Sequence, residues 1–90
     1  MKKQDQIGLD EQKQIQEQLK REIGKQVFQS LGEPANFQSM QVRHLWTEHF
    51  RVNVLVGLNA ASAKVAHSYF LMVGSDGGII TSIPKITKLY

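Results

Sequence analysis

The chain contains no cysteine among its 90 residues. This absence excludes a disulfide scaffold, a zinc site with thiolate ligands and a cysteine nucleophile. No stretch approaches the roughly 18 consecutive apolar residues that a membrane helix needs. Met1, Lys2 and Lys3 begin like a signal peptide, but the polar residues 4–6 follow where an apolar segment would be required. We therefore expect a cytoplasmic protein with no membrane-spanning segment.

The sequence also lacks the motifs that most often reveal an activity. The two glycine patterns that bind phosphate groups, G-x-x-x-x-G-K-[ST] and G-x-G-x-x-G, do not occur. The glycine-rich residues 74–78 join two predicted strands instead of leading into a helix. The three histidines, His44, His49 and His67, have no metal-binding spacing. No serine stands in the context of a catalytic nucleophile. We expect neither a metal nor a cofactor, and we favour a binding protein over an enzyme.

Size and charge set further limits. Ninety residues, 41% of them hydrophobic and 21% charged, are typical of one small globular domain. A chain this short buries only about two-thirds of the surface that its unfolded form exposes, so a partner subunit would add to a thin core. The net charge is +3, but basic residues are spread along the chain and interleaved with acidic ones. That pattern is typical of a solvated surface and makes a nucleic-acid partner the less favoured one.

A long amphipathic helix is predicted from about residue 10 to residue 31. Its apolar residues recur at every fourth position, namely Ile15, Leu19, Ile23, Val27 and Leu31. Asp10 is the predicted N-cap, and Gly32 suits the left-handed position after the last turn. A strict four-residue spacing gives a slanted stripe, which fits a helix lying obliquely across a twisted sheet.

The helix divides the chain into a short leading segment and one domain. Residues 1–9 are polar and are expected to form a flexible N-terminus, and residues 10–90 form a single α+β domain. Gly24, in the middle of the helix, has two interpretations. It marks a close approach to a strand, or it is a tolerated glycine that costs about 1 kcal/mol.

Four strands are predicted after the helix. The central strand is 50–56, where apolar side chains alternate with polar ones, and the others are 37–46, 63–73 and 79–83. Asp76 and Gly77 are typical of a tight hairpin turn. Pro84 cannot donate a ladder hydrogen bond, so the last strand ends there or lies at an edge.

The predicted fold is one N-terminal amphipathic helix packed on a four-stranded antiparallel meander sheet, an α+β arrangement. This architecture resembles helix-on-curved-sheet modules of cystatin-like type. Trp46 shares its parity along the first strand with Met40, Val42 and His44, which are expected to line one face. The side chains expected in the core are Phe50, Val52, Val54, Val56, Val65, Tyr69, Leu71 and Val73.

The opposite sheet face carries more apolar side chains than a solvated face needs. Leu55, Phe70 and Met72 are expected there, joined by Leu45 and Ile80 from flanking strands. A contiguous apolar patch on a small protein commonly marks an interaction site, although curling of the sheet or cover by the tail would also explain it. We therefore expect a non-catalytic protein-interaction module, a homodimer or a partner of another protein.

Two other functions remain open from the sequence. In one, a small-ligand binder or minor enzyme uses a cavity under the helix flanked by His44, His67 and Tyr69, with the two histidines about 10 Å apart. In the other, a weak nucleic-acid binder uses Phe70 beside Arg51 on the neighbouring strand. The register of residues 63–83 is also open, because a slip of one residue exchanges core for surface.

Overall fold

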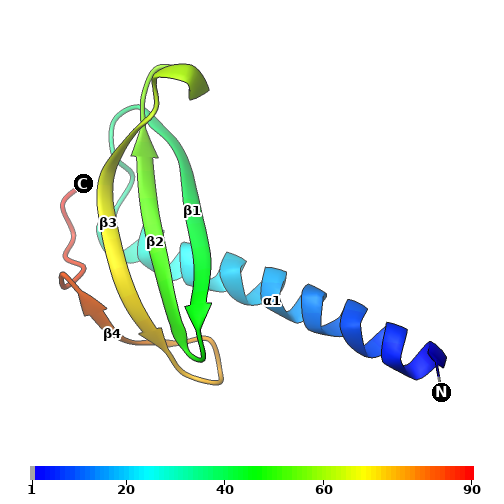
Figure 1. Ribbon diagram of the computed structural model, residues 1–90. Coiled ribbons are helices and arrows are strands. Elements are labelled where there is room, and N and C mark those ends of the chain that lie inside the picture. Colours follow the sequence, from blue (N-terminus) through cyan, green and yellow to red (C-terminus); the bar gives the residue numbers. More distant parts are fainter. Residues whose placement is uncertain (1) are drawn as a thin grey trace.

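The structure is a computed structural model that describes the backbone of residues 2–90 and the side chains of residues 13–90. It confirms the predicted α+β class. The elements are α1 (Lys2–Leu31), β1 (Phe37–Trp46), β2 (His49–Val56), the short 3₁₀ helix η1 (Ala60–Ser62), β3 (Lys64–Val73) and β4 (Ile79–Ile83). The four strands are antiparallel neighbours in the order β1-β2-β3-β4, a meander (Figure 1).

Helix α1 begins earlier than predicted and ends where predicted. It begins at Lys2, so Asp10 lies inside the helix and does not cap it. No proline precedes residue 34, and most of residues 2–9 are good helix formers, which explains the earlier start. After Leu31, Gly32 has φ +89° and its amide donates to the carbonyl of Phe28 at 2.9 Å. The flexible N-terminus predicted for residues 1–9 is not tested, because the side chains of these residues lie outside the described part, and it stays a prediction.

The C-terminal part of α1 covers one face of the sheet, which we call the inner face, and the rest of the helix extends past the β1 edge (Figure 1). The buried core consists of Ile23, Val27 and Leu31 from α1, Phe50, Val52 and Val54 from β2, and Tyr69, Leu71 and Val73 from β3. Ile15 lies on the same helical stripe as the core residues but keeps 62% of its surface exposed. The stripe therefore continues beyond the sheet that covers it.

Two register shifts reverse the predicted direction of side chains. Leu45 is an extra residue in β1, so Trp46 pairs with His49 on the outer face instead of following the inner-face parity. Ala66 is an extra residue in β3, so Val65 pairs with Leu55 and is 55% exposed instead of entering the core. The predictions for Trp46 and Val65 were wrong because a single inserted residue exchanges the two faces of a strand.

The glycine-rich turn and the C-terminal tail complete the fold. The predicted hairpin is confirmed, because Gly77 has φ +87° and the amide of Gly74 donates to the carbonyl of Gly78 at 2.8 Å. After β4 the tail returns to the end of α1. There the amides of Leu89 and Tyr90 donate to the carbonyl of Leu31 at 3.0 and 3.2 Å. These bonds satisfy a carbonyl that a helix C-terminus leaves without a partner.

Candidate interaction surface on the outer sheet face

Three aromatic side chains lie together on the outer face, at the end of the sheet where β1 turns into β2. The ring centroids of Trp46 and His49 are 5.1 Å apart, those of His49 and Phe70 are 5.4 Å apart, and those of Trp46 and Phe70 are 5.7 Å apart. Their spacing is that of favourable aromatic pairs. Trp46 nevertheless keeps 55% of its surface exposed.

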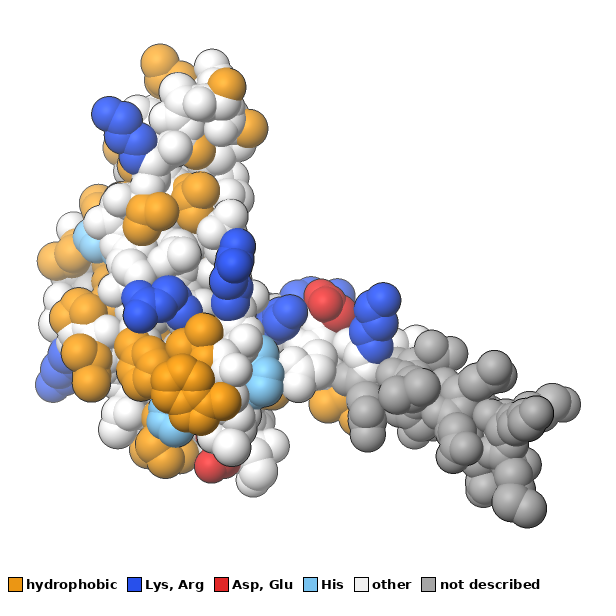
Figure 2. Space-filling model, viewed as in Figure 1, with side chains coloured by type: hydrophobic (Ala, Val, Ile, Leu, Met, Phe, Trp, Pro, Cys, Tyr) orange, Lys and Arg blue, Asp and Glu red, His pale blue; other side chains and the backbone are white. Residues whose placement is uncertain are grey.

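Two apolar side chains extend this cluster across the sheet. Met72 is the β3 partner of His49, and Ile83 on β4 is the partner of Phe70. Ile83 is 69% exposed, and Phe70 and Met72 are half-buried. Figure 2 shows hydrophobic side chains gathered at this end of the sheet, with histidines at their margin. We call Trp46, His49, Phe70, Met72 and Ile83 the outer patch.

A pair of arginines borders the outer patch. Arg43 on β1 lies directly opposite Arg51 on β2, and Arg51 in turn lies opposite Phe70. Within the described residues neither guanidinium belongs to an ion pair, and Arg51 donates to the hydroxyl of Ser68 at 3.0 Å. Like charges directly opposite each other on a sheet are destabilising. None of the four strands contains Asp or Glu to offset them.

Leu55 lies apart from the outer patch. Between them runs a polar row in which Ser68 lies opposite Asn53 and donates to its side-chain oxygen at 2.7 Å. Leu55 occupies the next row with Val65, at the other end of the sheet. The expected surface residues Leu55, Phe70 and Met72 are thus partly exposed, but only Phe70 and Met72 lie together.

The two flanking residues of the predicted patch lie at strand irregularities. Leu45 is the bulged residue next to Trp46 and is half-buried. Ile80 is skipped in the β3–β4 register, is 59% exposed, and lines a shallow groove with Gln26 and Lys85. The structure therefore places Leu45 beside the outer patch and Ile80 at the β4 edge.

The predicted pocket of His44, His67 and Tyr69 is only partly assembled. The rings of His67 and Tyr69 stack, and His67 Nε2 lies 2.7 Å from the Tyr90 hydroxyl. His44 instead contacts the Thr47 carbonyl at 2.7 Å. The β2 partners of the two histidines are four residues apart along that strand, about 13 Å. His44 and His67 therefore do not flank a common cavity.

Tyr69 is expected to make the stability of the fold decrease at alkaline pH. Burial on the inner face raises the pKa of its phenol above 10.0, and the nearby Tyr90 phenol raises it further. The unfolded phenol ionises at a lower pH than the folded one. The part of the free energy of unfolding that depends on the neutral phenol is therefore complete below pH 10 and is lost as the pH rises through the folded pKa. Urea unfolding should show stability falling above pH 10, and falling less steeply in Tyr69→Phe. An equally steep fall in the variant would contradict this assignment.

The sequence interpretation missed Trp46 and His49 as surface residues. Their position depends on the bulge at Leu45 and on the turn at Thr47, whose φ of +41° is rare for a β-branched residue. The only signal in the sequence was the short polar connection Thr47–Glu48, which predicts a hairpin but not its register.

The described part of the chain was compared with the requirements of a metal site and of a membrane-spanning helix. No group of three His, Asp or Glu side chains there could hold a metal ion. The helix it contains lacks the apolar character needed to cross a bilayer. The chain shows no significant match to a protein-family model, to a curated protein or to a solved structure.

Proposed function

We propose that this chain is a non-catalytic protein-interaction module that self-associates through the outer patch. The observation that carries the proposal is the aromatic cluster of Trp46, His49 and Phe70, which lies on an open sheet face with Trp46 55% exposed. Aromatic residues and methionine are enriched in interface cores, and aromatic side chains contribute much of the binding energy there.

A two-fold axis would also give the arginine pair a role. In an isologous contact both copies use the same surface, so when one residue of the first copy contacts a second residue of the other copy, the reverse contact is also made. With the axis between the row of Arg51 and the row of His49, the guanidinium of one copy lies over the aromatic rings of the other. Cation–π contacts of this kind are more favourable once water is excluded. The aromatic rings of each copy would then stabilise the positive charges of the arginine pair of the other copy.

The amount of exposed surface supports a partner in general. The chain exposes 6520 Å², whereas a folded monomer of 10.2 kDa exposes about 5300 Å² by the usual scaling. The difference exceeds the roughly 800 Å² that each partner buries in a standard interface. The open face of the sheet belongs to this surface.

Sedimentation velocity tests the proposal directly. Across a dilution series from low to high micromolar protein, the expected result is a shift towards twice the mass of the chain. A single species with the mass of one chain at high micromolar concentration would contradict self-association.

A second candidate function is binding of single-stranded nucleic acid on the same face. It is favoured by Arg43 and Arg51, which carry no ion pair among the described residues and lie beside the stacked rings of the outer patch. Bases stack on exposed aromatic side chains while basic residues contact the phosphates. The arrangement offers more rings for stacking and one more arginine than the single pair of Phe70 and Arg51 that the sequence indicated.

Fluorescence anisotropy with a labelled oligothymidylate tests the second candidate. If it holds, affinity falls with salt, and replacing Arg43 or Arg51 by glutamine lowers the slope of log K against log salt by about 0.7 for each phosphate that the variant no longer neutralises. Replacing the exposed Lys88 in the tail is the matched control and should leave the slope unchanged. No binding at low salt would exclude this function.

A further inference from the structure

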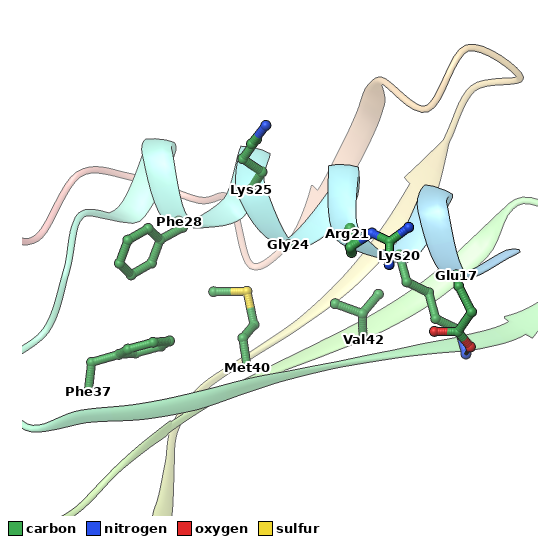
Figure 3. A pocket seen from close by; sticks show the side chains of 9 residues that line it. All are labelled: Glu17, Lys20, Arg21, Gly24, Lys25, Phe28, Phe37, Met40 and Val42. Atoms are coloured by element: carbon green, nitrogen blue, oxygen red, sulfur yellow. Dashed lines mark ion pairs between the residues drawn. The ribbon is translucent and has the colours of Figure 1, made fainter. Parts of the chain in front are cut away.

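A groove of about 490 Å³ lies between α1 and the edge strand β1, on the inner side of the sheet (Figure 3). Its apolar lining consists of Gly24, Phe28, Phe37, Met40 and Val42, and its charged lining consists of Glu17, Lys20, Arg21 and Lys25. The volume falls in the range of small-molecule sites. The groove is separate from the outer patch, which lies on the opposite face of the sheet.

Residue 24, in the lining of the groove, is glycine. A Cβ atom at this position would lie 3.5 Å from Met40 Sδ and 3.6 Å from Val42 Cγ2, both ordinary contact distances. A Cβ atom would therefore fit at this position in contact with both side chains, without displacing either of them. A glycine inside a helix is unfavourable compared with other residues, so the open space has a cost in stability.

The two ends of the groove differ in chemistry. At one end Phe28 and Phe37 pack with ring centroids 5.1 Å apart. At the other end Lys20 Nζ lies 3.9 Å from Glu17 Oε1, and Arg21 belongs to no ion pair among the described residues. The helical residues between these ends span about 16 Å. Figure 3 shows Lys25 pointing away from the groove, so the charge of the lining is concentrated at the Arg21 end.

We propose that this groove binds a free long-chain carboxylate. Its alkyl chain lies along Met40 and Val42 with the end against the packed rings of Phe28 and Phe37, and its carboxylate meets Arg21 and Lys20. The charge at this end supports the choice, because two cations outnumber the single carboxylate of Glu17. An arginine binds a carboxylate through paired hydrogen bonds. A peptide with charges spread along its length would match this polarity less well.

Two-dimensional NMR with dodecanoate below its micelle concentration is the test. The expected result is saturable shifts at the Gly24 amide and the Met40 methyl group. Dodecylammonium, with the same chain and the opposite charge, should bind at least about tenfold more weakly because Arg21 repels it. Octanoate should also bind more weakly, by up to about fourfold for each methylene removed.

Gly24→Leu is the decisive variant because it fills the groove while improving helix propensity. It should fold at least as well as the wild type and lose dodecanoate binding. Gln29→Leu places the same side chain on an exposed part of α1 outside the groove and should leave binding unchanged. Arg21→Gln, at an exposed position, should weaken dodecanoate but not dodecanol.

Four results would overturn the proposal. They are the absence of saturable shifts, equal affinity for dodecylammonium, unchanged affinity in Gly24→Leu, and binding to anionic vesicles without binding to monomeric dodecanoate. The last result would assign the surface to a membrane instead. None of them affects the outer patch, whose test is the mass of the protein.

Discussion

Replacing Phe70 by lysine is expected to convert the self-associated protein into a monomer. The Phe70 ring contacts both Trp46 and His49, so its removal disrupts the whole aromatic cluster. The new ammonium group would also lie opposite Arg51, adding a third positive charge to this part of the face. Aromatic hot-spot residues contribute about 2–4 kcal/mol each, and the isologous contact contains two copies of Phe70, so the dissociation constant should rise by at least about 30- to 1000-fold.

Leu58→Lys is the matched control for this experiment. Leu58 is the most exposed of the large hydrophobic residues described, at 85%, and it lies in the connection between β2 and β3. The substitution adds the same charge far from the outer patch and should leave the mass distribution unchanged. Equal loss of association in both variants would mean that net charge, and not the outer patch, governs self-association.

Phe50→Ala is expected to cause the largest loss of stability. Phe50 is 2% exposed on the inner face near the turn between β1 and β2, opposite His44 on β1 and Leu71 on β3. Truncating a buried phenylalanine typically costs about 3–5 kcal/mol. Domains have only about 5–15 kcal/mol in total, and short chains lie towards the lower end. Much of the stability of this fold should therefore be lost.

Urea unfolding followed by far-UV circular dichroism measures this loss. The midpoint should fall substantially while the slope of free energy against urea stays the same. Leu58→Ala, which removes an exposed side chain, should change stability by less than about 0.5 kcal/mol. A Phe50→Ala midpoint close to the wild-type value would contradict the assigned core.

The main elements could be predicted because local signals were consistent. The four-residue spacing from Ile15 to Leu31 predicted the helix, and Gly32 predicted its end, which the structure confirms. The alternation along β2 identified the inner face correctly, since Phe50, Val52 and Val54 are buried. The early start of α1 was missed because aspartate is a preferred N-cap residue, and Asp10 therefore predicted that the helix begins there.

The outer patch could be predicted only in part. Phe70 and Met72 follow a regular stretch of β3, so their parity was correct. Trp46 and Val65 lie beyond the bulged residues Leu45 and Ala66, and a bulge depends on tertiary packing that leaves no clear local signal. The sequence therefore predicted an apolar outer face but placed Trp46 and Val65, which belong to it, on the inner face.

The groove between α1 and β1 was not predictable from either element alone. Its shape depends on the distance between Gly24 and the side chains of Met40 and Val42, which neither periodicity nor propensity fixes. The sequence allowed a close approach to a strand at this glycine. The structure instead places the neighbouring side chains at ordinary contact distance and leaves the space beside them open.

Trp46 reports directly on self-association through the outer patch, because it is the single tryptophan of the chain and belongs to that patch. Its emission should be recorded over the same dilution series as the sedimentation profile. We expect the emission to shift to shorter wavelength as the dimer forms, in proportion to the dimer fraction. Emission that stays typical of a water-exposed indole while the mass doubles would contradict it and place the contact elsewhere on the molecule.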